Sequence, residues 1–401
     1  MSTPTRSGLN CHLVVATLLL ALLGIAQVES HLHGHGHGHD TVVELSGHRK
    51  LGALSEGVTR VASLTDEAGP WNSFKTLLDT KLGDVRTGVG ALKSYLQQFG
   101  YISKTDAPAG TPFTDTFDNI TQTAVMNYQR SFGLTVTGRL DVATLTQMIT
   151  PRCGREDVIN GTLIMLQRGL TATGTQHVSV GSQKWASFAG NPRWTRKNLT
   201  YAIDSTLLSP AVTQTDTEIA IDTAFAQWSA VTNLTFTRIQ SLTTADITIS
   251  FDLLDHGDGN PFDGQLGVLA HAYAPTNGRL HFDNSESWSI NIQSASSTLK
   301  DFDLVSVAVH EIGHLIGLEH SSVPDAIMYP SISPLSSKQA LNADDIAGAQ
   351  SLYGANPTFT PGTTTPGTGG NLGAAVASWR RLRAMDVALS CFGLLVASLF
   401  I

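Results

Sequence analysis

The chain has 401 residues, of which 41% are hydrophobic and 14% are charged, with a formal net charge of −8. This composition gives one large domain or two modest ones enough apolar side chains for a core. The mild charge, with no basic block and no Lys/Arg run interleaved with aromatic residues, argues against a nucleic-acid partner and favours an extracellular peptide substrate.

The N-terminus predicts a secretory signal peptide. Arg6 precedes an apolar run over residues 13–25, and small residues suited to cleavage follow at Ala26 and near Ser30. The run is too short and too lightly flanked to be read first as a membrane span. We therefore expect residues 1–26 to be removed, with the boundary extending at most to residue 30. Four N-x-S/T sequons agree with passage through the secretory pathway: Asn119, Asn160, Asn198 and Asn233.

A histidine-rich tract follows directly, with histidines that alternate mainly with glycine at His31, His33, His35, His37 and His39. Such a tract can bind metals loosely but has no periodic core face, so a flexible, removable tail explains it equally well. We assign it no catalytic role.

One cysteine remains for the folded part of the chain. Cys11 lies in the signal and Cys391 in a C-terminal apolar tail, which leaves Cys153. It has no internal disulfide partner, so it needs another kind of partner in an oxidising compartment. The alternatives are a buried inert thiol and an intermolecular bridge.

Residues 71–150 predict a small helical bundle. Apolar residues recur at steps of three and four from Phe74 to Leu96, where they include Leu78, Leu82 and Val85, and the pattern returns over 120–132 after a break rich in Pro, Gly and Thr. A short helix capped near residue 141 completes the bundle. In topology it resembles the peptidoglycan-binding-like fold that serves as a propeptide, and wall binding is a minor alternative.

From residue 199 the pattern predicts an α+β domain. Strands are expected over 199–203, 234–239 and 245–251, and an amphipathic helix over 215–230. A further helix over 305–315 would pack below a twisted mixed sheet.

Two histidine sets follow, and the first predicts a structural zinc site. Three imidazoles and one carboxylate form the closed set of four N/O ligands that structural zinc prefers. Its members are His256, Asp258, His271 and His281.

The second set is the strongest motif of the chain, H-E-x-x-H-x-x-G-x-x-H with a methionine shortly after it. Its members are His310, Glu311, His314, Gly317, His320 and Met328. Histidines at i and i+4 share one helix face, and a glycine with positive φ can turn the chain so that the third histidine reaches the same ion. Three protein ligands leave one zinc position open, and the adjacent glutamate can act as base and then acid on the attacking water. This extended pattern defines the metzincin proteases, whereas a lone H-E-x-x-H is common by chance.

Together with this motif, Pro151–Asp157 (PRCGRED) resembles the cysteine switch of the matrix metalloproteinases. In that family the prodomain thiolate takes the open zinc position and keeps the zymogen silent, and thiolate is a good zinc ligand. The resemblance implies that Cys153 binds zinc in the latent form and that Arg152 pairs with Asp157. Arg155-Glu156 stand where the family has an apolar residue and a proline. The activation cut is expected near Trp185.

Residues 256–286 closely resemble the structural zinc and calcium loop of the same family. The resemblance implies a calcium site made of three carboxylates and three backbone oxygens, from Asp263, Asp283 and Glu286 and from Gly264, Leu266 and Val268 respectively. A second calcium site, to which Asp246 would contribute, stays open because the loop 275–280 is shorter than in many members. Residues 329–332 resemble the wall of the pocket for the substrate residue just after the scissile bond, and a last helix ends the domain near Gly354.

The C-terminus predicts a lipid anchor. A Pro/Thr/Gly linker over 355–372 leads to small residues, a spacer with arginines, and an uninterrupted apolar run over 387–401. That order is the signal for a GPI anchor with a removed tail, and Gly373 is the candidate attachment site. A true membrane span is the alternative.

The resulting layout is a signal peptide (1–26), a propeptide (27–184) with a bundle (71–150) and a switch (151–157), a catalytic domain (185–354), a linker (355–372) and an anchor signal (373–401). The resemblance implies a matrix metalloproteinase of the short plant type without a hemopexin domain. We expect a latent zinc endopeptidase that also binds calcium, sits on the outer leaflet of the plasma membrane and cleaves extracellular proteins. The sequence does not indicate the activating protease. The alternatives are a non-catalytic cell-surface or wall-binding protein that keeps the protease fold, and another metzincin family.

Overall fold

The computed structural model of the chain describes residues 69–106, 112–166, 185–294, 298 and 300–360. All of them belong to one compact unit. The predicted signal peptide, the histidine-rich tract, most of the linker and the anchor signal with Gly373 lie outside these residues. No helix in the described part of the chain is long and apolar enough to cross a membrane.

The first part is a small helical bundle, as predicted. It consists of η1 (Asn72–Leu77), α3 (Val89–Gln98), α4 (Asn119–Ser131) and α5 (Val142–Met148). Asp118 and Asp141 begin α4 and α5, and the side chain of each accepts a hydrogen bond from the backbone N–H three residues on. Edge-to-face aromatic contacts fill the core, and they join Trp71, Phe74, Tyr95 and Phe99.

The helical pattern fails over residues 78–88. Gly83 and Gly88 have φ values of 90° and 103°, which a helix does not allow. Leu78, Leu82 and Val85 are exposed by 41%, 45% and 72%, so their spacing is not a core pattern. The chain instead forms a loop that Asp115 holds by accepting from two backbone N–H groups.

A short connector leaves the bundle. It contains β1 (Val158–Ile159), β2 (Thr162–Leu163) and η2 (Ile164–Leu166), with β1 and β2 antiparallel. The apolar core of the bundle extends past this connector to Phe262 and Val268 of the catalytic domain. The two domains therefore share one core cluster.

The catalytic domain is built on a five-stranded mixed sheet with the order β4-β3-β5-β7-β6. Its strands are β3 (Asn198–Ile203), β4 (Thr235–Arg238), β5 (Ile247–Asp252), β6 (Ala270–Ala272) and β7 (Arg279–Asp283). All neighbours are parallel except β6 and β7, which pair antiparallel with His271 opposite His281. A separate pair, β8 (Ser287–Ser289) and β9 (Asp301–Asp303), precedes the helix that carries His310 and His314.

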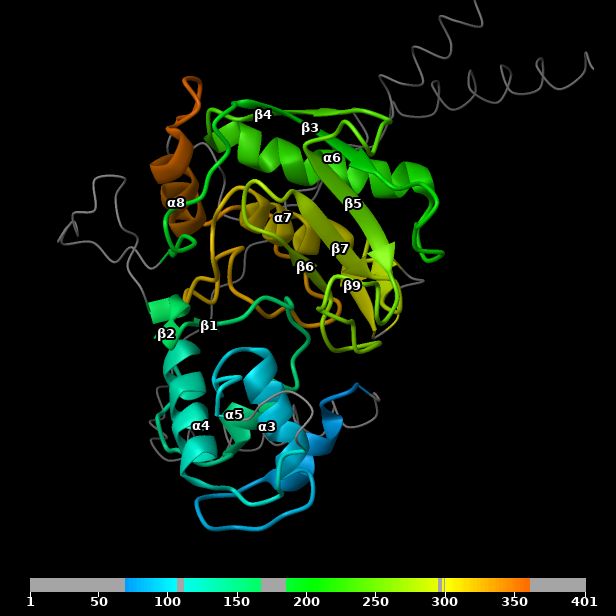
Figure 1. Cartoon of the computed structure of the whole chain (residues 1–401). Helices are drawn as coiled ribbons and strands as arrows, with labels where there is room; N and C mark the ends of the chain where they lie inside the picture. The colour runs from blue at the N-terminus through cyan, green and yellow to red at the C-terminus, as the bar shows by residue number, and fades with distance from the viewer. Residues whose placement is uncertain (1–68, 107–111, 167–184, 295–297, 299, 361–401) are drawn as a thin grey trace, which may run out of the picture. The chain divides into compact units, whose positions relative to one another are not determined.

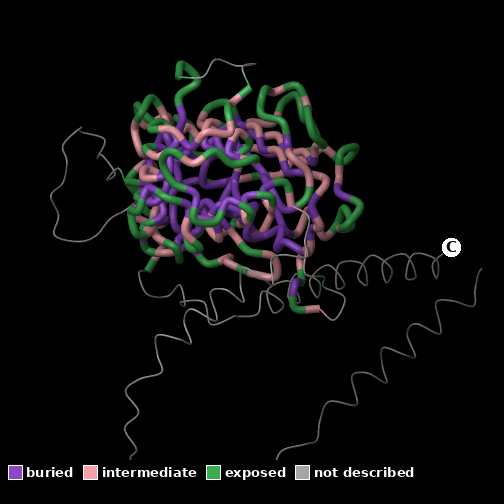
Figure 2. The backbone as a smooth tube through the Cα atoms, turned by 90° about the horizontal axis from the view of Figure 1, so that it is seen from below, coloured by how far each residue is buried: buried purple, intermediate pink, exposed green. Residues whose placement is uncertain are grey.

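Helices α6 (Gln214–Val231) and α7 (Leu304–Leu315) lie against the same side of this sheet, and α8 (Ala343–Tyr353) closes the domain (Figure 1). Trp228 of α6 is fully buried and donates from its indole N–H to the carbonyl of Val309 in α7, at 2.9 Å. The buried segments run through the middle of the described part, and exposed loops surround them (Figure 2). The predicted α+β class with a preceding helical bundle is confirmed.

Candidate metal centres

Every residue of α7 is buried, so the helix holds its polar side chains inside the domain. The helix ends at Leu315, and Gly317 turns the chain with a φ of 105°. A Cβ atom at Gly317 would also lie 2.7 Å from the carbonyl oxygen of Pro192. Only glycine therefore fits this turn, which ends the helix and redirects the chain.

The turn brings the third histidine to the other two. One ligand atom each from Cys153, His310, His314 and His320 lies within 4.8 Å of the others, and all four residues are buried. The Sγ atom of Cys153 lies 3.5 Å from Nε2 of His314. The structure thus unites the residues that the sequence predicts as the catalytic zinc site and its latent-form ligand.

The hydrogen bonds of the imidazoles fix which nitrogen can bind a metal. Nδ1 of His310 donates to the carbonyl of Ile327 and Nδ1 of His314 to that of Leu318, both at 2.7 Å. Because a carbonyl only accepts, each Nδ1 carries the proton and each Nε2 keeps a lone pair. Nδ1 of His320 donates to Oδ1 of Asp157, a propeptide residue, at 2.9 Å.

This donor set fits zinc. Nε2 of His310 and of His320 are buried without a hydrogen-bond partner, as orphaned ligand atoms would be. Burial lowers the pKa of His310 to about 3 and lowers the pKa of His314 and His320 as well, so the imidazoles stay neutral. Burial and then the Glu311 carboxylate raise the pKa of the Cys153 thiol, so its thiolate needs a cation beside it.

Glu311 lies within this cluster. Its side chain is fully buried, and neither carboxylate oxygen has a hydrogen-bond partner. Burial raises its pKa to about 8. A carboxyl group with a pKa near neutrality can both take up and release a proton, which suits a general base that later acts as an acid.

The turn at Met328 packs against α7, the helix that carries His310 and His314. A Cβ atom at Gly313 would collide with Sδ of Met328, so the methionine packs directly against α7. Oxygens of Asp345 accept from the backbone N–H groups of Ile327 and Met328 at 2.8 and 3.0 Å. Asp345, in the first turn of α8, therefore anchors the turn at Met328.

The switch segment lies between two stretches of the catalytic domain as an added strand. Arg152 exchanges backbone hydrogen bonds with Gly267 and Leu269, at 3.0 and 2.9 Å. On the other side the N–H of Cys153 donates to Pro330 at 2.9 Å, and Ile332 donates back to Pro151 at 3.1 Å. The propeptide thus occupies backbone groups on both sides of the site.

A buried ion pair holds the switch loop together, as the resemblance implies. The Arg152 guanidinium donates to both oxygens of Asp157, at 2.7 and 2.8 Å, and both side chains are fully buried. The same guanidinium lies 3.7 Å from the ring centre of Phe99. Although burial acts to raise it, Arg152 and His320 lower the pKa of Asp157 to about 2.

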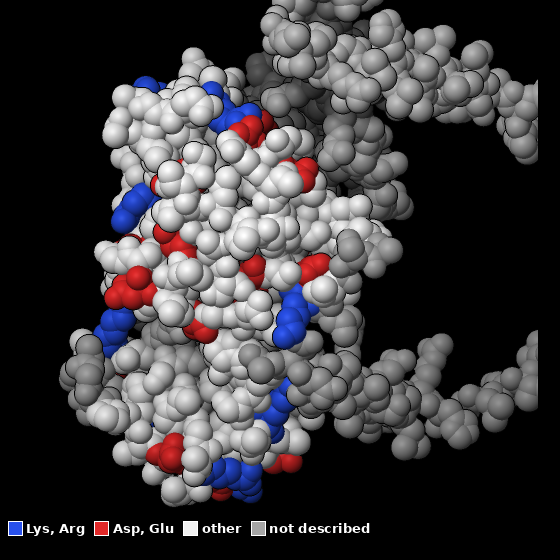
Figure 3. Space-filling model, turned by 90° about the vertical axis from the view of Figure 1, so that its right-hand side faces the viewer, with Lys and Arg blue, Asp and Glu red and all other residues white. Residues whose placement is uncertain are grey.

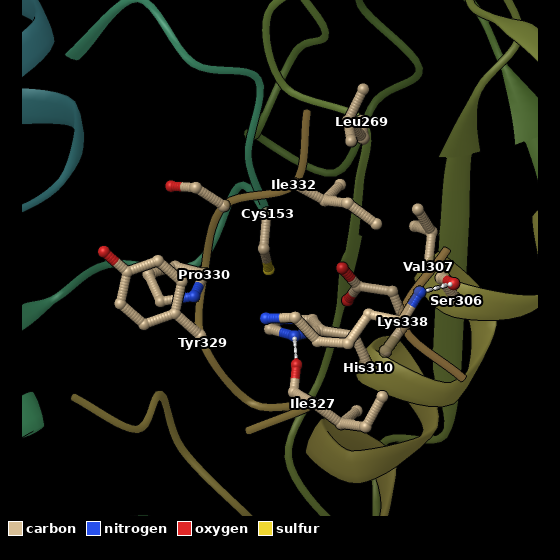
Figure 4. Close-up of a pocket in the computed structure, with 12 residues that line it drawn as sticks. Cys153, Leu269, Ser306, Val307, His310, Ile327, Tyr329, Pro330, Ile332 and Lys338 are labelled. Carbon is tan, nitrogen blue, oxygen red and sulfur yellow. Dashed lines mark hydrogen bonds between the residues drawn. The ribbon is translucent and has the colours of Figure 1, made fainter. Parts of the chain in front are cut away.

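An apolar pocket opens beside Cys153, His310 and Glu311 (Figure 4). Its walls come from the end of the sheet, from α7 and from the segment after Met328, and include Leu269, Val307, Tyr329, Pro330 and Ile332. Lys338, which the sequence did not single out, also lines it. Its ammonium group donates to the carbonyls of Pro324 and Ala326 at 2.7 and 3.0 Å.

The second predicted metal set also comes together. One ligand atom each from His256, Asp258, His271 and His281 lies within 4.8 Å of the others. Oδ2 of Asp258 is 2.8 Å from His271 and 3.1 Å from each of the other two rings. Burial lowers the pKa of His271 to about 4, which keeps a lone pair on its ring. Tyr273, which sequence reasoning missed, donates to the same carboxylate oxygen at 2.7 Å.

The three carboxylates expected to bind calcium share one pattern. One oxygen of each accepts from a backbone N–H, those of Val268, Ser285 and Leu266. The other oxygen of each is buried without a partner, in Asp263, Asp283 and Glu286. Burial, and then the Asp283 charge, raise the pKa of Glu286 to about 8. Buried carboxylates with one free oxygen each fit a hard cation such as calcium.

Asp246, the candidate ligand of a second calcium ion, has protein partners for both carboxylate oxygens. One carboxylate oxygen pairs with Arg196, and the other accepts from the N–H and hydroxyl of Thr200, at 2.8 and 3.0 Å. The guanidinium already supplies the positive charge that a second calcium ion would bring.

Of the four sequon asparagines, Asn119, Asn160 and Asn198 are exposed and Asn233 is half-buried.

Known proteins and protein families resemble this chain in sequence. The family model for matrixin matches residues 193–354, and that for a putative peptidoglycan binding domain matches residues 85–148. Metalloendoproteinase 1-MMP of Arabidopsis thaliana is 44% identical over 287 residues, covering 72% of this chain and 74% of that one. Metalloendoproteinase 2-MMP of the same plant is 42% identical over 342 residues, covering 81% and 88%. Neutrophil collagenase of Homo sapiens is 39% identical over 254 residues, covering 62% and 47%.

Proposed function

Because the chain belongs to the matrixin family of zinc metalloendopeptidases, we propose that it is a latent extracellular endopeptidase that Cys153 keeps inactive. Zinc is the catalytic metal of this family, and calcium is typical of it. One observation carries the proposal: the propeptide thiol shares a single ligand cluster with the three histidines beside Glu311.

The residues of the site have complementary roles in this proposal. His310, His314 and His320 would hold zinc through Nε2, and zinc held there supplies Lewis acidity for the substrate carbonyl and the attacking water. Glu311 takes the proton of that water and returns it to the leaving amine, as its raised pKa allows. The buried surroundings exclude bulk water and strengthen these electrostatic interactions.

The substrate would bind where the switch segment lies. The backbone groups of Gly267, Leu269 and Pro330 pair with an extended chain in the structure, and main-chain pairing of this kind accepts many sequences. The apolar pocket beside His310 would take one substrate side chain. Latency follows directly, because the propeptide fills these backbone groups and places a thiol among the zinc ligands.

Location is part of the same proposal. A signal peptide and the C-terminal anchor signal would bring the enzyme to the outer face of the plasma membrane, with Gly373 as the attachment site, and the four sequons agree with this route. Extracellular proteins and peptides would then be its substrates. Thiol modification or proteolysis near Trp185 would release the propeptide.

The test is hydrolysis of a quenched generic metalloproteinase peptide by the purified, zinc-loaded full chain, before and after an organomercurial. Activity should appear on thiol modification, and Glu311→Ala should remove it. A Cys153→Ser variant should be active without the mercurial, because serine does not replace thiolate as a ligand. A processed, zinc-loaded wild type that cleaves no peptide would refute the enzymatic proposal and favour a binding role.

A further inference from the structure

We propose that Glu319 forms a cation-binding subsite beside the catalytic centre, which Arg155 fills in the latent form and a basic substrate side chain fills in the active form. This inference rests on the proposed function. It adds the substrate class: extended peptides with Arg or Lys a few residues from the scissile bond.

Glu319 is a buried carboxylate that belongs to neither histidine set nor to the expected calcium ligands. On the face shown in Figure 3, acidic and basic side chains are scattered over the surface, whereas Glu319 is 1% exposed. Neither of its carboxylate oxygens has a hydrogen-bond partner among the described residues. Its backbone N–H donates to the carbonyl of Ala186. A buried carboxylate without hydrogen bonds is costly unless a positive charge compensates for it.

That charge comes from the propeptide. Nη2 of Arg155 lies 3.5 Å from Oε1 of Glu319, an ion pair without hydrogen-bond geometry. The Arg155 guanidinium also lies 4.7 Å from the ring centre of Phe188. The subsite therefore has an acidic floor and an aromatic wall, and this combination suits a planar guanidinium.

The position of Arg155 makes it a stand-in for a substrate residue. It follows Cys153 by two residues, and Cys153 lies among the zinc ligands. Residues 151–154, directly before Arg155, pair with backbone groups on either side of the site, and the chain bends at Gly154 and Arg155. A peptide that binds there and bends in the same way can place a side chain where Arg155 lies.

The subsite is distinct from the apolar pocket. None of Arg155, Phe188 and Glu319 lines that pocket, which Leu269, Val307 and Ile332 help to form. Departure of the propeptide removes Arg155 but leaves Glu319 and Phe188 in place. The carboxylate then needs another cation, and a basic side chain of the substrate supplies one.

The test uses pairs of quenched peptides that carry arginine or its neutral isostere citrulline at each position within three residues of the scissile bond. At one position the activated wild type should prefer arginine by about tenfold or more in kcat/KM, as a charge-assisted contact predicts. Glu319→Gln should bring this ratio to within about twofold, whereas the charge-conserving Glu319→Asp should keep a preference. The ratio is taken within each enzyme, so it does not depend on the active fraction.

A second measurement needs no proteolysis. In the full-length zymogen, the rate at which a maleimide labels Cys153 reports opening of the switch. Arg155→Gln and Glu319→Gln should each raise it about tenfold, and the double variant should be labelled no faster than either single one. Additive effects would contradict a direct pairing.

The outcomes separate the two proposals. Equal cleavage of arginine and citrulline peptides by the wild type, or a preference that Glu319→Gln leaves unchanged, overturns the subsite and leaves the proposed function standing. Failure of the zinc-loaded, activated enzyme to cleave any peptide overturns both.

Discussion

Replacing Arg152 by methionine should shift the switch segment (residues 151–157) toward its open form, in which Cys153 is accessible. Methionine keeps an apolar stem but removes the guanidinium that donates to both oxygens of Asp157. Both partners are fully buried, so the variant leaves a buried carboxylate without its cation. Two donors remain, the Tyr101 hydroxyl and Nδ1 of His320, each at 2.9 Å.

The magnitude follows from this geometry. Removing one partner of a buried pair costs about 3–5 kcal/mol, and the two remaining donors favour the lower end. In the open loop Asp157 regains water, so the cost falls on the closed state alone. About 3 kcal/mol corresponds to an opening equilibrium raised roughly 10²-fold.

The assay is the rate of maleimide addition to Cys153 in the intact zymogen, read by mass spectrometry of the peptide that contains it. A matched control is Lys104→Gln, which removes an ion pair to Glu156 in the same loop, at 3.1 Å but with the lysine 76% exposed. Exposed pairs contribute about 0–1 kcal/mol, so the control should be labelled within about fivefold of the wild-type rate. Wild-type labelling of the Arg152 variant, or equal acceleration in the control, would refute the reasoning.

Three further predictions concern metals and the bundle. Asp157→Ala should speed the loss of zinc from the zymogen to a chelator about 10–100-fold, since His320 loses its acceptor; an unchanged rate would contradict this role. Calcium should raise the melting temperature, increasingly between pH 6 and 8, and Glu286→Gln should weaken the effect. Burial raises the pKa of Glu286 to about 8 from 4.5, so the calcium-free folded protein binds the Glu286 proton more tightly than the unfolded chain does. The calcium-free protein therefore loses stability as the pH rises from 6 to 8. Calcium needs the ionised form of Glu286, so its stabilising effect grows over the same range. A calcium effect that shrinks with pH would count against the site. Asp118→Ala should lower the free energy of unfolding of the bundle by about 2–4 kcal/mol in denaturant titrations. The substitution removes a helix cap and leaves Lys93, which is 3% exposed, without its counter-ion at 2.7 Å. A loss below about 0.5 kcal/mol would show that this ion pair does not stabilise the fold.

The sequence predicted the metal centres better than the elements around them. Ligand spacing is a local property: the i, i+4 histidines and the turn at Gly317 place three imidazoles without knowledge of the rest of the fold. Helices α6 and α7 were likewise expected within one residue of their observed ends, and α8 ends next to Gly354, where a last helix was expected to end. The short strands β6 and β7 were not, because their residues read as metal ligands rather than as an alternating pattern.

The predictions that failed, and the contacts that were missed, have two causes: local glycine conformation and partners far apart in the chain. The spacing of Leu78, Leu82 and Val85 imitates a helix, but the backbone of two glycines overrides it. The Arg155–Glu319 pair joins residues far apart in the chain, and the sequence showed only that Arg155 departs from a familiar motif. Lys338 of the pocket gave no local signal at all, since a single lysine after a turn is ordinarily solvent-exposed.

The cluster shared by the bundle and the catalytic domain has a consequence for activation. Phe262 and Val268 are 4% and 1% exposed and belong to the same core cluster as the bundle residues. Cleavage and departure of the propeptide would expose these two side chains to water, next to the backbone groups that would pair with the substrate. In the proposed activation, loss of the propeptide would therefore expose apolar surface as well as free the site. A substrate that covers these two side chains again would gain the free energy of burying them.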